Sequence, residues 1–312
     1  MKLLSKEVFI PEQNGRPVFP GFVAYISADD PILMHCSGWV DASDTYDDFA
    51  DIISRDNGET WSAPRMRQQS KAVEAGRIRY GGNAAFFDPD TGALIVFSCQ
   101  ALYREGVHVL YNRIRIEINR YDPTSATWAE PVLTDMGFKE GIISDFCVPI
   151  KTSQGHLLFP AYKPATDATG NRTHYPGHDW ATVDTSLTII GEYRADGEVS
   201  WRAGDTVPCD LEGTCRGLDE PTVVELKDGR FAMICRGDNS VFPDRPGYKW
   251  LTFSEDGGRS WCEAAPLFCT DGEALESSST GSALLRSIKT DQLYWIGNIC
   301  TEGERANGNW PR

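Results

Sequence analysis

One stretch of the sequence places a carboxylate and a guanidinium at the two ends of a predicted hairpin. Glu220 opens a β-prone run and Arg236 ends the next one, with the turn sequence Lys227-Asp228-Gly229 between them. A tight turn there reverses the chain, so both side chains are expected at one end of the hairpin. A guanidinium is the side-chain group best suited to pair with a carboxylate in bidentate fashion. The alternative is a structural ion pair of Glu220 with Arg236 or Arg216.

A second segment with chemical potential, residues 174–180, combines aromatic side chains with two histidines. We expect a loop here, because Pro176-Gly177 interrupts any regular helix. Tyr175 and His178 are candidate substrate contacts, since aromatic side chains commonly line ligand sites and either group can exchange a proton. The alternative is a loop that only covers the edge of the fold. Histidines at this spacing suit a metal ion only on a helix, so we predict no metal site.

The overall charge restricts the classes of partner. The chain of 312 residues has 30 Lys and Arg against 45 Asp and Glu, a formal net charge of -15. Such a charge repels polyanions, so we expect neither a nucleic-acid nor a membrane partner. An anionic ligand can still bind where arginines are concentrated. Residues 1–7 break into charge before an apolar signal region forms, so a cytoplasmic location is expected.

The nine cysteines show no paired spacing of the kind found in zinc sites or disulfide frameworks. We expect most of them to be reduced and buried, because a free cysteine behaves as a small apolar residue. The Gly81-Gly82 pair is not followed by a helical pattern, so it does not predict a phosphate-binding loop. We therefore expect no cofactor.

The elements that must position the candidate residues are short β-strands. Long helical periodicity is nearly absent, and β-prone runs alternate with Gly, Pro, Asp and Asn. The clearest runs are residues 94–97, 114–118, 157–159 and 231–235. Tight hairpin turns are predicted at residues 88–92, 152–155 and 227–229. This pattern indicates an all-β sandwich, barrel or propeller.

A repeated turn motif distinguishes among these folds. Residues 54–61 and 254–261 both fit Ser-x-Asp-x-Gly-x-Thr/Ser-Trp. In such a turn we expect the Asp to accept backbone N–H groups, the Gly to adopt a positive φ, and the Trp to pack beneath the loop. Eroded copies occur at residues 196–201 and 121–128. The four tryptophans are separated by 67, 73 and 60 residues, a period that suits four-stranded propeller blades.

These motifs resemble the Asp boxes of the sialidase (neuraminidase) superfamily, with its bacterial neuraminidase repeats. The resemblance extends over residues 15–312. It implies an all-β, six-bladed β-propeller that forms a single domain, residues 1–312, with the last blade incomplete in this chain. It also implies an active site on the propeller axis, with Asp56 and Asp256 of the Asp boxes as structural groups on the outer rim.

The resemblance also assigns roles to the predicted hairpin. Arg236 is expected to bind the substrate carboxylate, and Glu220 is expected to be the base that polarises a tyrosine nucleophile. Arg312 follows the Asn- and Gly-rich segment 307–311 and is similar to the third arginine of the family. The tyrosine would then lie beyond Arg312.

The family's first arginine has no direct match, because Val18 occupies its place in the expected Arg-Ile-Pro signature. Arg16 lies two residues earlier, on the same face of an extended strand, and is a candidate substitute. Arg79 is a further candidate for carboxylate binding, with an exposed strand-end arginine as the alternative.

In the family, the acid/base aspartate precedes the first Asp box. The resemblance therefore implies that it lies in the acidic segment 41–51 of this chain. Asp44 is the preferred candidate and Asp41 the second, and the other carboxylates of the segment are expected to be solvated loop charges. A catalytic acid must hold its proton near neutral pH, and like-charged neighbours with partial burial raise a carboxyl pKa in that direction.

The favoured function is a sialidase-like exo-glycoside hydrolase that removes a terminal acidic sugar from a glycan with retention of configuration. A tyrosine nucleophile suits an anionic anomeric centre, which would repel a carboxylate. One alternative is a propeller lyase or exo-hydrolase for uronic-acid or other sugars, which keeps Arg236 and uses Tyr175 or His178 as acid or base. Another is a carbohydrate-binding propeller without catalytic activity.

Overall fold

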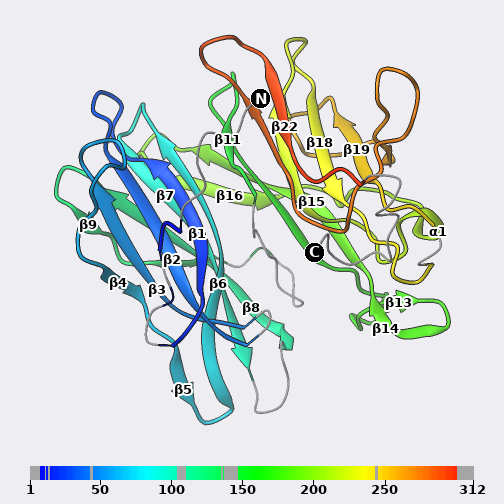
Figure 1. Ribbon diagram of the computed structural model, residues 1–312, viewed down its shortest axis with the longest axis horizontal. Helices are drawn as coiled ribbons and strands as arrows, with labels where there is room; N and C mark the ends of the chain where they lie inside the picture. The colour runs from blue at the N-terminus through cyan, green and yellow to red at the C-terminus, as the bar shows by residue number, and fades with distance from the viewer. Residues whose placement is uncertain are drawn as a thin grey trace.

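The computed structural model describes residues 8–10, 12, 15–42, 45–103, 110–134, 136, 147–242 and 245–300. Within these ranges the protein is built almost entirely of antiparallel β-sheet, and the one helix is a single turn, α1 (Leu211–Thr214). Figure 1 shows the sheets following one another along the chain, from the blue first sheet to the orange C-terminal hairpin.

Each large sheet is formed by strands that are close in sequence. The first sheet contains β1 (Val18–Tyr25), β2 (Leu33–Ala42), β3 (Thr45–Ser54) and β4 (Arg65–Gln68). The second contains β5 (Lys71–Val73), β6 (Gly76–Asp88), β7 (Ala93–Tyr103), β8 (Leu110–Asp122), β9 (Thr127–Trp128) and β10 (Val132–Thr134). The third contains β11 (Ile150–Lys151), β12 (Leu157–Pro164), β15 (Asp184–Tyr193) and β16 (Val199–Ala203). The fourth contains β17 (Asp219–Glu225), β18 (Phe231–Arg236), β19 (Lys249–Ser254) and β20 (Ala265–Pro266).

Two hairpins complete the described strands. β13 (His174–Tyr175) and β14 (His178–Thr182) are inserted between β12 and β15, and β21 (Ala283–Arg286) pairs with β22 (Leu293–Ile296). Successive antiparallel sheets of this kind, built on four main strands, are the blades of a β-propeller. The predicted strands at residues 94–97, 114–118, 157–159 and 231–235 are confirmed and lie in β7, β8, β12 and β18. The number of six blades stays a prediction.

Both Asp boxes form the predicted turn. In the first, the side chain of Asp56 accepts hydrogen bonds from the backbone N–H of Thr60 (2.8 Å) and from the hydroxyl of Ser54 (2.7 Å). These bonds, with that from the Thr60 hydroxyl, lower the pKa of Asp56 to about 2. Gly58 has a φ of 92°, and the indole of Trp61 donates to its carbonyl at 3.1 Å. The second box repeats the hydrogen bonds to the aspartate, here Asp256, but the buried indole N–H of Trp261 has no acceptor among the described residues.

The core lies between neighbouring sheets. Phe97 of the second sheet and Phe159 of the third pack with ring centroids 4.1 Å apart, and Trp201 of the eroded third motif packs edge-on against both. A second apolar cluster joins the third and fourth sheets through Leu158, Val223, Met233, Trp250 and Trp261. Both faces of the third sheet therefore bury aliphatic and aromatic side chains, which holds the second sheet against one face and the fourth sheet against the other.

The antiparallel topology gives each sheet two different ends. One end carries the β1–β2, β6–β7, β11–β12 and β17–β18 hairpins and the Asp-box turns that follow β3 and β19, and in Figure 1 these hairpins lie along the upper edge of the view. In the first, second and fourth sheets, the other end carries the starts of β1, β6 and β17, the ends of β2, β7 and β18, and the starts of β3, β8 and β19. We call this second end the charged end, since the clusters described below lie there.

The prediction for the cysteines is confirmed. All nine are free and five of them, the majority, are buried, whereas Cys262 and Cys269 are exposed. In the described part of the chain, no helix has the length and apolar character needed to cross a membrane. Among the same residues, no group of three His, Cys, Asp or Glu side chains is arranged to hold a metal ion.

Candidate active site

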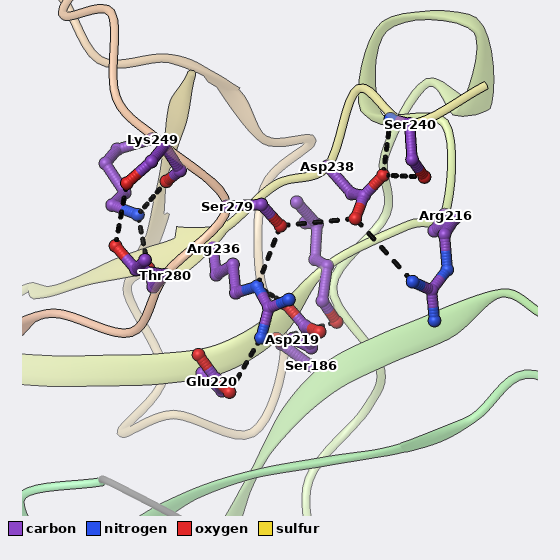
Figure 2. Close-up of polar contacts among 12 residues, drawn as sticks. Ser186, Arg216, Asp219, Glu220, Arg236, Asp238, Ser240, Lys249, Ser279 and Thr280 are labelled. Atoms are coloured by element: carbon purple, nitrogen blue, oxygen red, sulfur yellow. Dashed lines mark hydrogen bonds and ion pairs between the residues drawn. The ribbon is translucent and has the colours of Figure 1, made fainter. Parts of the chain in front are cut away.

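The predicted hairpin brings Glu220 and Arg236 into direct contact. β17 and β18 pair so that Asp219 lies opposite Arg236, and a bulge follows between Asp219 and Thr222. Glu220 lies in this bulge with a φ of 41°, which redirects its side chain toward the neighbouring strand. Arg236 Nη1 donates to Glu220 Oε1 at 2.8 Å, and Arg236 Nε lies 3.6 Å from Asp219 Oδ1 (Figure 2).

A hydroxyl and a third carboxylate extend this contact. Ser279 Oγ accepts a hydrogen bond from Arg236 Nε at 3.0 Å and donates to Asp238 Oδ2 at 3.2 Å. Asp238 also accepts from the backbone N–H of Ser240 at 2.6 Å, and its Oδ2 lies 3.6 Å from Arg216 Nη1. Figure 2 shows the carboxylates of Glu220 and Asp238 on opposite sides of the Arg236–Ser279 pair.

Asp184, the first residue of β15, adds a further ion pair, with Arg172 at 3.6 Å. It belongs to the same electrostatic group, because its carboxyl interacts with the charges of Asp219, Arg216 and Arg236. We use the name Arg236 cluster for this group. Its members are Arg172, Asp184, Arg216, Asp219, Glu220, Arg236 and Asp238.

Two carboxyls of the Arg236 cluster titrate near neutral pH. Burial, reinforced by repulsion from Asp219, raises the pKa of Asp184 to about 7 although Arg172 and Arg216 oppose the shift. Burial also raises the pKa of Asp219 to about 7, with repulsion from Glu220 added and attraction to Arg236 opposing it. For Arg236, burial favours the neutral form, but the adjacent carboxylates outweigh it and raise its pKa. The cluster therefore holds a permanent cation beside groups that exchange protons near pH 7.

Asp47 is the centre of a second cluster at the charged end of the first two sheets. Its carboxylate lies 2.9 Å from Arg16 Nη2, 3.3 Å from Arg77 Nε and 3.1 Å from Arg79 Nη1. Burial alone would raise the pKa of Asp47, but hydrogen bonds from Ser70 and Arg16 and the arginine charges hold it below its ordinary value. We call these four charged residues the Asp47 cluster.

The structure brings some of the predicted site residues together, whereas others lie outside the part that it describes. Arg16 and Arg79 come together in the Asp47 cluster, and Arg79 is only 13% exposed with its guanidinium 5.5 Å from the ring of Tyr103. Asp44 and Arg312 lie outside the described residues. Asp41 lies near the end of β2, and its side chain is not among those described.

One expectation for the acidic segment is wrong. Asp47 and Asp51 are not solvated loop charges, since they lie on β3 and are only 7% and 5% exposed. They lie four residues apart and therefore share one face of the strand. Arginines from other elements compensate them: Asp51 lies 3.5 Å from Arg67 Nε.

The segment that carries Tyr175 and His178 is a β-hairpin rather than the predicted loop. Gly177 makes the turn with a φ of 79°, which glycine adopts without steric cost. The rings of Tyr175 and His178 lie 5.8 Å apart, and Tyr175 packs edge-on against Phe242. Arg216 Nε donates to the carbonyl of Thr182 on β14 at 3.2 Å, so the hairpin is attached to the Arg236 cluster.

A polar cavity of about 620 Å³ lies elsewhere, between the first and second sheets. None of the predicted site residues lines it. Its most buried cation, Arg67, lies between the rings of Phe22 and Trp128 and donates to Asn83 at 2.7 Å. These contacts assign Arg67 to the packing of the two sheets.

Several residues in and beside the Arg236 cluster were missed in the sequence. Asp184 and Lys249 each begin a strand, as Glu220 lies near the start of its own, so their position before a β-prone run was a usable signal. Arg172, Asp238 and Ser279 lie outside the strands, and nothing local in the sequence relates them to Arg236.

Residues 53–286 match a family model described as a BNR repeat-like domain. The chain belongs to this family. The match covers most of the chain and agrees with the two Asp boxes and the repeated sheets. No curated protein sequence matches the chain.

Solved structures with the same fold include the Hadza microbial sialidase Hz136, with a TM-score of 0.59 and 16% identity over 88% of this chain and 52% of that one. NanB sialidase from Streptococcus pneumoniae has a TM-score of 0.56 and 11% identity over 94% of this chain and 63% of that one. A PL25 ulvan lyase bound to -[GlcA(1-4)Rha3S]- has a TM-score of 0.53 and 11% identity over 89% of this chain and 65% of that one. The BNR-repeat chain thus has the sialidase-like propeller fold and spans about half to two thirds of the length of these proteins.

Proposed function

We propose that this BNR-repeat protein is a carbohydrate-active propeller, and specifically a sialidase-like exo-glycoside hydrolase that removes a terminal acidic sugar from a glycan. The observation that supports this most strongly is the contact between Glu220 and Arg236 at the charged end of β17 and β18. Family membership and the sialidase-like fold agree with the proposal.

Arg236 is suited to bind the carboxylate of the sugar. Its Nη1 and Nε groups donate to Glu220 and Ser279, which fixes the plane of the guanidinium. The side chain is 18% exposed, so it is held in place yet accessible from one side. A guanidinium fixed in this way offers a carboxylate a charge-assisted hydrogen bond with little loss of side-chain entropy.

The remaining roles follow from the resemblance to sialidases. In the proposal, Glu220 is the base that polarises a nucleophilic hydroxyl, and Asp44, or else Asp41, is the acid that protonates the leaving group. Arg312, Arg16 and Arg79 are proposed as further contacts to the anionic substrate.

Hydrolysis of a fluorogenic sialoside by the purified chain tests the proposal. We expect turnover by the wild type and loss of turnover in Arg236→Met. Arg202→Met is the matched control, because Arg202 forms a half-exposed ion pair with Glu192 on β15 and β16 (2.8 Å) away from the cluster. Equal activity in wild type and Arg236→Met would contradict the proposal.

A uronan lyase is the second candidate, favoured by the Tyr175–His178 contact and by the carboxyls that titrate near pH 7. A lyase must neutralise the uronate carboxylate and abstract a proton beside it, which an arginine and a nearby base can do. Ultraviolet absorbance of an unsaturated uronate product, with no sialoside hydrolysis, would select this reaction. Binding of acidic sugars without either reaction would indicate a carbohydrate-binding propeller.

A further inference from the structure

Lys249 is a buried cation immediately beside the Arg236 cluster. It is the first residue of β19, its side chain is fully buried, and it lies directly opposite Arg236 in the register of β18 and β19. Two cations facing each other across a pair of strands destabilise a sheet, and burial of an ammonium adds a desolvation cost. A specific set of contacts must offset this arrangement.

Those contacts are backbone carbonyls on either side of Ser279. Lys249 Nζ donates to the carbonyl of Ser278 at 3.1 Å and to the carbonyl of Thr280. Figure 2 shows the ammonium held against this loop, next to Ser279. The backbone N–H of Ser277 donates to the carbonyl of Gly247 at 2.9 Å, so the same loop is also attached to the segment that leads into β19.

Ser279 in turn connects the two ion pairs of the site. Its hydroxyl accepts from Arg236 and donates to Asp238, and the residue is only 4% exposed. A hydroxyl has one hydrogen to donate, so its orientation is fixed once Asp238 takes that hydrogen and Arg236 supplies the other bond. The position of the Ser279 backbone therefore determines the direction in which Arg236 presents its guanidinium.

We infer that Lys249 is a positioning residue, whose ammonium holds the Ser278–Thr280 carbonyls and thereby sets Ser279 and the orientation of Arg236 toward a substrate carboxylate. The inference rests on the proposed role of Arg236 as the carboxylate contact. Lys249 itself does not touch the substrate in this account, because it is covered by the loop that it holds.

The same arrangement makes carboxylate binding depend on pH. Burial, with the charge of Arg236 added, lowers the pKa of Lys249 to about 8, while Glu220, Asp219 and Cys300 oppose the shift. The ammonium is charged below that pH, and loses a proton as the pH rises through it. The two carbonyl contacts then weaken, so the affinity for an acidic sugar is expected to fall on the alkaline side.

The test compares three variants by calorimetric titration with N-acetylneuraminate and glucuronate, with galactose as the neutral control. Lys249→Met and Ser279→Ala should each weaken binding of the acidic sugars about tenfold, the effect of one charge-assisted hydrogen bond. Lys151→Met is the matched control, since Lys151 forms its ion pair with Asp88 at 2.8 Å on other sheets and should leave the affinity unchanged.

Coupling between the two changes separates positioning from general destabilisation. If Lys249 acts through Ser279, the double variant should bind no more weakly than either single variant. Ser279→Ala should also lose less affinity than the wild type as the pH rises through the pKa of Lys249, because only the ionisation of Asp184 and Asp219 then still acts on Arg236. Additive losses, or an unchanged affinity in Lys249→Met, would overturn the inference. If Lys249→Met does not fold, the pH dependence of wild type against Ser279→Ala decides the same question.

Failure of the proposed function has a different signature. A wild-type protein that binds neither acidic sugar contradicts the role of Arg236 as carboxylate contact. In that case a crystal structure of Lys249→Met still decides the positioning role. Loss of the 3.0 Å contact between Arg236 Nε and Ser279 Oγ supports it, and an unchanged contact refutes it.

Discussion

The Asp47 cluster and the Arg236 cluster contain the same kinds of side chain, but in different proportions. In the first, three arginines surround one carboxylate. In the second, three arginines share four carboxylates, and the buried Lys249 lies beside them. The pKa of Asp47 is lowered, whereas the pKa values of Asp184 and Asp219 are raised to about 7.

This difference shows that the ratio of arginines to carboxylates, together with burial, decides whether a charged cluster is structural or can exchange protons. Asp47 stays ionised at any ordinary pH, so its cluster is a fixed set of charges that ties β3 and β6 to the N-terminal segment. The Arg236 cluster keeps a permanent cation while neighbouring carboxyls take up or release protons near pH 7. The second arrangement is the one that acid–base chemistry on an anionic substrate requires.

The largest effect is expected for Arg236→Met. The change leaves the partly buried carboxylates of Glu220 and Asp219 without their cation, which should destabilise the fold by about 3–5 kcal/mol. Urea unfolding at neutral pH measures this loss. The control Arg202→Met should change stability by no more than about 1 kcal/mol, because its ion pair is exposed on both sides. Similar losses of unfolding free energy in the two variants would show that the Arg236 cluster contributes no more to stability than a surface ion pair does.

Asp47→Asn should have the next largest effect, about 3 kcal/mol, because it leaves three arginines without their shared carboxylate. The loss should be constant around neutral pH and shrink in acid. The folded-state pKa of Asp47 is lowered, so its contribution is present above the ordinary carboxyl pKa and is lost as the pH falls. Unfolding free energies measured from acid to neutral pH check this, and a loss that grew in acid would contradict it.

Asp219→Asn should show the opposite dependence on pH. The folded-state pKa of Asp219 is raised from 3.8 to about 7, so wild-type stability is fully present below the lower value and falls as the pH rises toward the upper one. The amide does not ionise. The variant should therefore gain stability relative to wild type across this range, by at most about 1.4 kcal/mol per pH unit. Unfolding free energies of the two proteins, measured across this pH range, check the prediction. If the difference in unfolding free energy does not change with pH, Asp219 titrates normally.

The smallest effect is expected for Arg77→Gln. Arg77 is 42% exposed, and Asp47 keeps Arg16 and Arg79 in its absence, so the stability change should stay below about 1 kcal/mol. Arg79→Gln is the matched comparison, because that side chain is only 13% exposed and should cost more. Thermal unfolding of the pair ranks the two arginines, and a larger loss for Arg77→Gln would reverse the proposed order.

The parts of the molecule that could be predicted from the sequence depend on short stretches of chain. The Asp boxes are formed by side chains within eight consecutive residues, such as Ser54, Asp56 and Trp61, so their geometry follows from the motif. The contact of Glu220 with Arg236 also follows from one tight hairpin.

The rest of the site depends on contacts between distant segments. Ser279 reaches Arg236 across 43 positions in the sequence, and Asp184 joins the cluster from a different sheet. No local pattern encodes such distances. The expectation of a solvated Asp47 failed for the same reason, because its partners Arg77 and Arg79 come from the next sheet.

The most direct test of the central claim is a crystal structure of the protein with an acidic monosaccharide, N-acetylneuraminate or glucuronate. The account predicts that the sugar carboxylate lies within hydrogen-bonding distance of the Arg236 guanidinium, with Glu220 and Ser279 still in contact with that group. A carboxylate bound at the Asp47 cluster, with Arg236 unoccupied, would contradict it.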